Sequence, residues 1–447
     1  MLGIASLGLF LRFINYDSIP PFTETQDEFF YPWAGMTLLK TGVPVGWSWF
    51  PSYPDRNIVV YWGATYPLVS PWVEKPPLYS LITGTAAIIS GANQLNEVRL
   101  SVIRLVPIFL SFATIVLVGL FAKLIFDETV GITSALLYAT VPAIVMSNRL
   151  SLVENLLTPI CLLALIIFSS NYFRKSSYPL ILFLSGLAIL TKNIGVALPL
   201  SIGFIYILRK NWKYLFIIGS VSLAFFLIHP LMGLFYDWKL FVNVLKGYQV
   251  AHATIGLPEI IQTLFSFPTI ASKERLFQDG SLLAGYILFL SAPFWLKVQG
   301  FLHEEKYYLL LSFPFIYLLL LGLLESGGTQ FSFFGWHVYP LFPFLVIVLA
   351  KTLKSVYQSG NLFMSAFFYL VIGFSSIRFL LLVFPSFKEA WQYMLVVIFL
   401  LLFPILFLNR KPVKITLLAF FSIYLAINIL VIFNLARIYT QIAQPLL

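Results

Sequence analysis

Long apolar runs dominate this chain, and short polar turns separate them. A membrane-crossing helix needs about 20 consecutive apolar residues, and many runs reach or approach that length. Together with an N-terminal segment at 1–15, they predict an all-α polytopic membrane protein with about 13 transmembrane helices. The other runs lie near residues 105–125, 129–147, 153–171, 178–191, 194–209, 213–235, 281–297, 306–324, 338–353, 361–384, 390–409 and 413–436.

Two long stretches do not fit the pattern of membrane-crossing helices. Residues 16–104 hold several acidic residues and many prolines and aromatics, and residues 236–280 are polar and mixed. We therefore predict one integral membrane domain over residues 1–447 with two large loops. Within the first loop, the apolar segment 78–92 is short and is expected to form an interfacial helix.

Composition and charge support a membrane protein and orient it. Hydrophobic residues make up 60% of the chain and charged residues 10%, whereas soluble domains have about 25% charged residues. The net charge of +10 does not indicate nucleic-acid binding, because the basic residues form short clusters between apolar runs. They lie in turns on one side, which the positive-inside rule makes cytoplasmic. Both long loops are therefore expected outside the cell membrane, which we take to be a bacterial or archaeal plasma membrane.

The first loop contains a pair of adjacent carboxylates, Asp27 and Glu28. Carboxylates beside an apolar segment are costly unless they are paired or used. Glycosyl transfer needs such a group to take a proton from the acceptor, and partial burial would raise its pKa toward a useful value. A solvated pair that caps a helix is the alternative.

The same loop ends in Trp72-Val73-Glu74-Lys75-Pro76-Pro77-Leu78. The prolines stiffen this segment and could hold Lys75 just above the bilayer, where an ammonium group suits a lipid-linked phosphate. A lysine that extends to lipid headgroups is the alternative. The same explanation is favoured for Arg104, which lies where a span leaves the outer surface.

Three further turns on the outer side carry candidate residues within apolar surroundings. Arg149 and Glu154 lie between two spans, where Glu154 could also cap a helix. Lys192 lies in another turn, and a functional or pairing role is plausible for it. His337 opens a span next to two aromatic residues; it could bind a metal or a phosphate, or belong to an interfacial aromatic belt.

The usual signals for nucleotide and metal sites are absent from the sequence. There is no GxxxxGK[ST] motif, no strand–GxGxxG–helix unit and no DxD triplet, so a nucleotide-sugar donor has no visible binding loop. His229 and His252 are isolated, and no spacing indicates a zinc site. We identify no certain cofactor, and a divalent cation is kept as an open alternative.

The order of these motifs resembles that of membrane glycosyltransferases with the GT-C fold, in particular protein O-mannosyltransferases and the aminoarabinose transferases acting on lipid A. The resemblance covers about the first 210 residues. It rests on motifs that follow one another in the same order and lie on one face: Asp27-Glu28, Met36 to Gly42, Trp72 with Glu74 to Leu78, Arg104-Leu105, Arg149 with Glu154, and Lys192 with Gly195.

The resemblance implies a GT-C fold and a polyprenyl-phosphate-linked sugar as donor, with direct displacement and inversion at the sugar. Asp27 would be the general base on a lipid, glycan or protein acceptor, and Glu28 would orient the acceptor or bind sugar. Lys75, together with Arg149, would hold the donor phosphate. Further residues of the expected substrate-binding set are Glu74, Glu154, Lys192 and His337.

The chain departs from the family pattern in three ways. The segment between Gly42 and Trp72 is longer than in the lipid A enzymes, and Glu154 stands where an aspartate is frequent. No large soluble domain follows the last span, which argues against an oligosaccharyltransferase. Other functions stay open: a secondary transporter, although no internal repeat is visible, an O-antigen-type ligase or polymerase, and a non-catalytic membrane scaffold.

Overall fold

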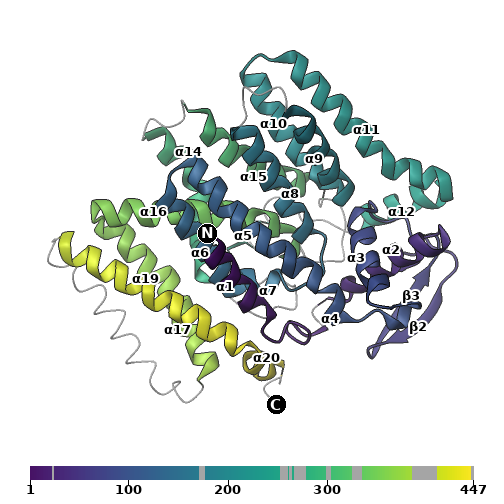
Figure 1. Cartoon of the computed structure of the whole chain (residues 1–447), viewed down its shortest axis with the longest axis horizontal. Helices are drawn as coiled ribbons and strands as arrows, with labels where there is room; N and C mark the ends of the chain where they lie inside the picture. The colour runs from purple at the N-terminus through teal and green to yellow at the C-terminus, as the bar shows by residue number, and fades with distance from the viewer. Residues whose placement is uncertain are drawn as a thin grey trace.

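The computed structural model describes residues 1–22, 25–170, 177–251, 260, 264–265, 278–298, 304–324, 335–384 and 410–443. These residues are mostly helical (Figure 1). The elements up to the first long helix are α1 (Leu2–Phe13), η2 (Gln26–Phe29), α2 (Phe30–Thr41), β1 (Gly46–Trp47), β2 (Asn57–Tyr61), β3 (Ala64–Val69), α3 (Leu78–Ile89), η3 (Leu95–Glu97) and α4 (Leu100–Ile103). The remaining elements are α5 (Leu105–Ile125), α6 (Glu128–Thr140), α7 (Pro142–Ser147), α8 (Glu154–Ser170), α9 (Tyr178–Thr191), η5 (Asn193–Val196), α10 (Ala197–Leu208), α11 (Trp212–Tyr236), α12 (Trp238–Ala251), α14 (Gly280–Val298), α15 (Glu305–Leu324), η7 (Gly335–Leu341), α16 (Phe342–Ser359), α17 (Leu362–Val383), α19 (Arg410–Phe433) and α20 (Leu435–Ala443).

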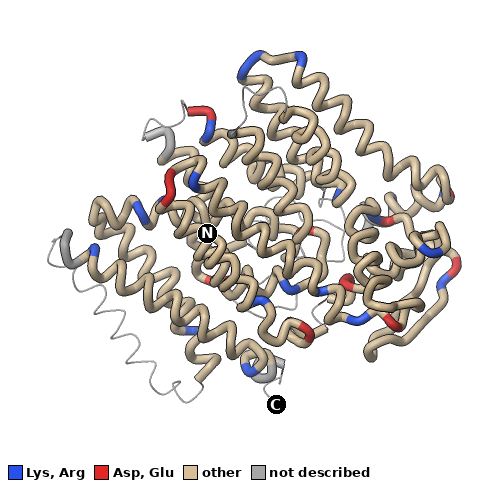
Figure 2. The backbone as a smooth tube through the Cα atoms, viewed as in Figure 1, with Lys and Arg blue, Asp and Glu red and all other residues tan. Residues whose placement is uncertain are grey.

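Six helical segments in the described part of the chain are long and apolar enough to cross a membrane. They are Leu100–Ile125, Trp212–Tyr236, Glu305–Leu323, Gly335–Ser359, Leu362–Val383 and Val413–Phe433. Charged residues lie mostly at helix ends and in the first loop (Figure 2). The prediction of a mostly helical, multi-pass membrane protein is confirmed. The number of about 13 crossings stays a prediction, since the described residues include only these six segments that are long and apolar enough by this measure. The span expected at 390–409 lies outside the described residues.

The span expected at 129–147 is two helices, α6 and α7. Val141 is extended, and Pro142 occupies the first turn of α7. Proline lacks a backbone N–H and fixes its own backbone, so it is favoured in the first turn of a helix and weakens a helix interior. The last carbonyl groups of α6 therefore lack partners within their own helix. They become available to a side chain from elsewhere in the fold.

Small residues let the first helices approach closely. A Cβ atom on Gly8 of α1 would lie 3.0 Å from the Cβ of Ala139 in α6, and one on Gly131 of α6 would lie 2.7 Å from the Gly119 carbonyl oxygen of α5. Helices in lipid gain stability from such close van der Waals contact. The three helices consequently form one packed unit beneath the first loop.

The first loop contains a three-stranded antiparallel sheet, so the prediction of an all-α chain is wrong in this respect. The strand order is β1-β3-β2, with Val59 of β2 opposite Tyr66 of β3. Trp62 and Gly63 connect β2 to β3, and both have positive φ, as two-residue hairpin turns of type I′ require. The buried face carries Tyr66, whose ring packs edge-on against Phe29. The strands are short, and β3 contains Pro67, which hides the sheet in the sequence.

Helices α2 and α3 lie beside the sheet at one end of the bundle, on the right of Figure 1. Their contact needs two glycines. A Cβ atom on Gly35 would lie 1.7 Å from the Ser80 carbonyl oxygen, and one on Gly84 would lie 2.3 Å from the Met36 nitrogen. Helix α3 confirms the helix expected at 78–92, while its interfacial position stays a prediction. The pair forms a rigid support for η2, which carries the acidic pair.

Candidate active site

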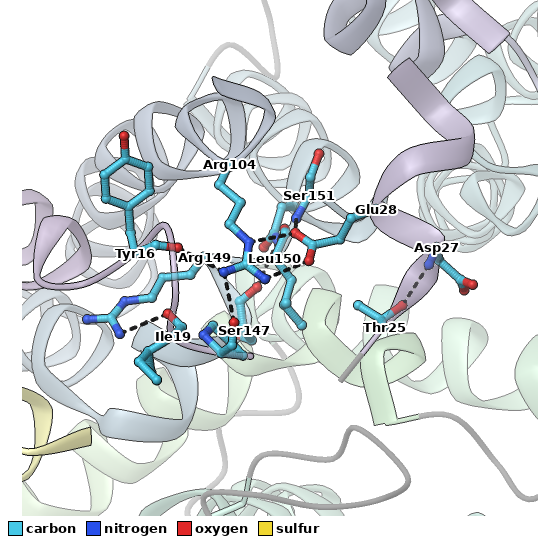
Figure 3. A network of polar contacts seen from close by, with 12 residues as sticks. Tyr16, Ile19, Thr25, Asp27, Glu28, Arg104, Ser147, Arg149, Leu150 and Ser151 are labelled. Atoms are coloured by element: carbon cyan, nitrogen blue, oxygen red, sulfur yellow. Dashed lines mark hydrogen bonds and ion pairs between the residues drawn. The ribbon is translucent and has the colours of Figure 1, made fainter. Parts of the chain in front are cut away.

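A buried ion pair joins the first loop to the membrane bundle. Glu28 of η2 and Arg104, between α4 and α5, are both fully buried. The guanidinium donates through Nε to Oε1 at 2.9 Å and through Nη2 to Oε2 at 2.7 Å. The Ser151 amide donates a third hydrogen bond to Oε1 at 2.8 Å (Figure 3). The expectation that Arg104 reaches lipid headgroups is wrong, because its charge is compensated in the interior.

Arg104 also fixes the chain that leads into the first loop. Its Nη1 donates to the carbonyl oxygens of Tyr16 at 2.9 Å and Pro20 at 2.8 Å. The planar guanidinium can make this many bonds at once because its donors have a fixed fork geometry. One side chain therefore holds both the acidic pair and the segment that precedes it.

Asp27 precedes Glu28 but points away from it (Figure 3). Successive side chains of a 3-10 helix point in directions about 120° apart. Because the Glu28 side chain points into the protein interior, the Asp27 side chain points away from it. The Thr25 hydroxyl caps η2 by accepting the Asp27 N–H at 3.1 Å. The Asp27 side chain is half-buried. The two carboxylates thus differ in environment although they are neighbours in the sequence.

Glu74 and Lys75 lie near Asp27. Glu74 is 8% exposed, and its Oε1 has no hydrogen-bond partner. The pKa of Glu74 is raised to about 7, mainly by burial and to a smaller extent by the charge of Asp27. A hydrogen bond from Ser48 and the charge of Lys75 act in the opposite direction and lower this pKa. Lys75 is half-buried. This part of the first loop therefore gathers two acids and one cation.

His229 of α11 packs against the same segment. Its Nε2–H donates to the Val73 carbonyl oxygen at 3.0 Å, and its ring lies perpendicular to that of Phe241. This contact could not be predicted from the sequence, because 156 residues separate His229 from Val73. His252, the other isolated histidine, lies outside the described residues.

The turn from Asn148 to Asn155 is held by two buried arginines. Arg12 of α1 donates to the carbonyl oxygens of Tyr138 and Ala139 at the end of α6, and to Asn148 Oδ1 at 2.8 and 3.2 Å. Asn148 in turn donates to Asn155 Oδ1 at 2.9 Å. The proline break after α6 thus supplies the acceptors that a buried guanidinium needs. The turn is tied to α1 at one end and to the top of α8 at the other.

Arg149, a predicted phosphate partner, is also fully buried in this turn. Its Nη2 donates to the Leu11 carbonyl oxygen at 2.8 Å and its Nη1 to the Ile19 carbonyl oxygen at 3.2 Å. Both acceptors belong to α1 and the chain that follows it. These are the contacts of a residue that supports the backbone around the site.

Three predicted substrate-binding residues meet in one cluster. The Lys192 ammonium donates to Glu154 Oε1 at 2.6 Å and lies 2.7 Å from His337 Nδ1. Lysine has no acceptor, so His337 accepts here and carries its proton on Nε2. The Tyr317 hydroxyl donates to the His337 carbonyl oxygen at 2.8 Å and fixes the start of η7. We call Glu154, Lys192 and His337 the inner cluster.

The inner cluster and the acidic pair are neighbours. Ser151, which donates to Glu28, lies three residues before Glu154 on the same turn. The Tyr79 hydroxyl of α3 is 3.1 Å from Ser151 Oγ, and its pKa is raised by burial and by the charges of both Glu28 and Glu154. Sequence reasoning missed Ser151 and Tyr79, since a backbone donor and a lone buried tyrosine carry no sequence signal.

A divalent cation does not fit the residues that surround this site. No group of three histidine, cysteine or acidic residues gathers anywhere in the described ranges. In the inner cluster the Lys192 ammonium lies between Glu154 and His337, and Glu28 is already bound by Arg104. We therefore derive no chemical step through a metal.

Comparison with known proteins gives a partial sequence match and a structural likeness over most of the chain. Residues 74–233 match the family model described as dolichyl-phosphate-mannose-protein mannosyltransferase. Comparison with curated proteins gives no significant sequence match. The structure is similar to ArnT from Cupriavidus metallidurans bound to undecaprenyl phosphate, with a TM-score of 0.55 and 13% identity over 98% of this chain and 77% of that one.

It is also similar to the Archaeoglobus fulgidus oligosaccharyltransferase solved with zinc and sulfate. There the TM-score is 0.51, with 13% identity over 93% of this chain. The chain spans about half of that protein, 52% of its length. At such identities the structural likeness shows the fold alone. The resemblance predicted from the motifs is confirmed: the chain is a membrane protein of the GT-C fold whose residues 74–233 match the dolichyl-phosphate-mannose-protein mannosyltransferase family.

Proposed function

We propose that this chain is an integral membrane glycosyltransferase. It moves a sugar from a polyprenyl-phosphate donor to a lipid, glycan or protein acceptor on the extracytoplasmic face, with inversion at the sugar. The family match includes the Glu74-Lys75 motif and the turn that carries Glu154. The ArnT structure was solved with undecaprenyl phosphate, which supports a lipid phosphate as the leaving group.

The different environments of Asp27 and Glu28 carry the proposal. Both oxygens of Glu28 accept hydrogen bonds from Arg104 or Ser151, so Glu28 is poorly suited to take a proton. Asp27 is half-buried and directed away from that network. A general base must reach the acceptor and hold the proton as the new bond forms. We therefore assign this role to Asp27 and a positioning role to Glu28.

Lys75 is the proposed partner of the donor phosphate. Its ammonium is half-buried next to Glu74 in a proline-stiffened segment. As the carbon–oxygen bond to the phosphate breaks, negative charge grows on the leaving group, and a fixed cation in a poorly hydrated site stabilises it. Arg149 is assigned to support instead, since its bonds go to the carbonyls of Leu11 and Ile19.

The site is proposed to face outward in a plasma membrane. The loop at 16–104 would then be the first extracytoplasmic loop and carry the catalytic motif, and 236–280 the second. The excess of basic residues in the turns of the opposite side supports this orientation. Much of the second loop lies outside the described residues.

The experiment that tests the proposal measures release of free polyprenyl phosphate. Purified protein in lipid is incubated with radiolabelled polyprenyl-phosphate sugars and crude membrane acceptors. We expect release by the wild type and a loss of at least about 100-fold in Asp27→Asn, because general-base catalysis contributes about 10²–10⁴-fold. Glu128→Gln is the control, since Glu128 is exposed and its one ion pair within the described ranges is with the exposed Lys123. Folded wild-type protein that releases nothing from any donor would favour a transporter or scaffold.

A further inference from the structure

We propose that the inner cluster is the subsite for the donor's sugar, and that it accepts a neutral or amino sugar and disfavours one that carries a carboxylate. This inference rests on the function proposed above and names the substrate class of that site.

The first observation is a buried carboxylate oxygen that lacks a hydrogen-bond donor. Glu154 Oε2 is buried and has no hydrogen-bond partner among the residues that the structure describes, while Oε1 is bound by Lys192. A buried carboxylate oxygen without a donor destabilises the unoccupied site, so a ligand that supplies a donor is bound more tightly.

Lys192 supplies the complementary half of the subsite. Its ammonium has three donors, of which one goes to Glu154 Oε1 and one to His337 Nδ1. No partner for the third is found among the described residues. The Lys192 side chain is 14% exposed, against 1% for Glu154 and 4% for His337. The ion pair of Glu154 and Lys192 therefore keeps one acceptor and one donor for a ligand, which is the pairing that a sugar hydroxyl satisfies.

The charge of the inner cluster argues against a phosphate there. One ammonium and one carboxylate cancel, and the Nδ1 lone pair that His337 offers to Lys192 requires a neutral ring. The free oxygen of Glu154 would repel a phosphate or a uronic acid. It would attract a hydroxyl or an ammonium group. Recognition of the phosphate therefore falls to Lys75, and the inner cluster recognises the uncharged or cationic part of the donor.

Helix capping does not explain Glu154. It is the first residue of α8, where a carboxylate usually bonds to free backbone N–H groups. The contacts of its carboxylate go to Lys192 instead, 38 residues away in sequence. A purely structural ion pair does not explain the unpaired Oε2 either. Buried polar atoms in proteins nearly always have a hydrogen-bond partner, so a carboxylate with only a structural role would be expected to have both oxygens bonded.

The test compares binding of three lipids to the full chain in lipid nanodiscs. The probes are undecaprenyl phosphate, undecaprenyl-phosphate mannose and undecaprenyl-phosphate glucuronic acid. We expect the wild type to bind the mannose lipid more tightly than the other two. In Glu154→Gln, binding of the mannose lipid falls by about tenfold or more, the preference for mannose over glucuronic acid shrinks, and binding of undecaprenyl phosphate is unchanged. Glu128→Gln is the control and behaves as the wild type.

The outcomes separate this inference from the proposed function. Wild-type protein that binds none of the three lipids contradicts both. Wild-type protein that binds all three equally, or a Glu154→Gln variant that loses affinity for undecaprenyl phosphate as much as for the mannose lipid, overturns the sugar subsite and leaves the transferase standing. If Glu154→Gln does not fold, Glu154→Asp replaces it. Asp keeps the charge but withdraws the carboxylate by one carbon, so binding of the mannose lipid should fall, binding of undecaprenyl phosphate should be unchanged, and glucuronic acid should stay disfavoured.

Discussion

Replacing Arg104 by methionine should destabilise the protein more than any other change of one polar side chain in the first loop network. The substitution removes two hydrogen bonds to Glu28 and two to the carbonyls of Tyr16 and Pro20. Glu28 is then left as a fully buried carboxylate with the Ser151 amide as its remaining donor. Breaking a buried pair from one side costs about 3–5 kcal/mol.

The double-mutant cycle with Glu28→Gln isolates the pair itself. Glu28→Gln alone should cost about 1–3 kcal/mol, because it leaves two bonds of Arg104 to carbonyls in place. The double variant should cost clearly less than the sum of the two single changes, since no unpaired charge remains in it. Reversible unfolding in mixed micelles gives the free energies. Two results would refute the view that the two buried charges compensate each other. One is a double variant whose loss of unfolding free energy equals the sum of the single losses within about 0.5 kcal/mol. The other is a loss below about 1 kcal/mol in Arg104→Met.

The other predictions concern pH, packing and the donor phosphate. Because burial raises the pKa of Glu74 from 4.5 to about 7, the folded protein binds this proton more tightly than the unfolded chain, and stability falls as pH rises from about 4.5 to 7, by roughly 3 kcal/mol in all. Melting temperatures at several pH values should show this slope in the wild type and a weaker slope in Glu74→Gln; equal slopes would contradict the assignment. Gly35→Ala should cost about 1–3 kcal/mol or more, because its Cβ would lie 1.7 Å from the Ser80 carbonyl oxygen, whereas Gly3→Ala, with no atom within 4 Å, should be neutral in the same unfolding assay. Lys75→Met should raise the KM for the donor and lower kcat together by about 10–100-fold, with partial rescue by Lys75→Arg, because a charge-assisted bond to phosphate contributes about 1.5–3 kcal/mol; an unchanged KM would remove Lys75 from the donor site.

The membrane class and the candidate residues follow from the sequence because polar groups are rare in apolar surroundings. Glu154, Lys192 and His337 were selected one by one on that ground, and the structure brings Lys192 within hydrogen-bond distance of both Glu154 and His337. A lone charge in an apolar run needs a partner, so such residues tend to meet. This reasoning selects residues without naming their partners.

Partners separated by long stretches of chain could not be predicted. The pairing of Glu28 with Arg104 spans 76 residues, and that of His229 with Val73 spans 156. From the sequence, Arg104 was assigned to lipid headgroups and Arg149 to the donor phosphate. Their acceptors in the structure, Glu28 and backbone carbonyls, are distant in the chain and leave no pattern in the sequence. The hairpin of β2 and β3 was missed for a related reason, since short strands with a proline lack a clear alternation of polar and apolar residues.

Arg12 has a consequence for the biosynthesis of the protein. Helix α1 has 12 residues and carries this arginine in its last turn, so it is short for a membrane span and bears a charge that is unfavourable in hydrocarbon without partners. The acceptors that compensate this charge, the carbonyls of Tyr138 and Ala139 and the amide of Asn148, lie 126 to 136 residues later in the chain. Helix α1 therefore cannot reach its final environment until α6, α7 and Asn148 have been made and have joined it. During that interval α1 depends on the lipid surface or the insertion machinery.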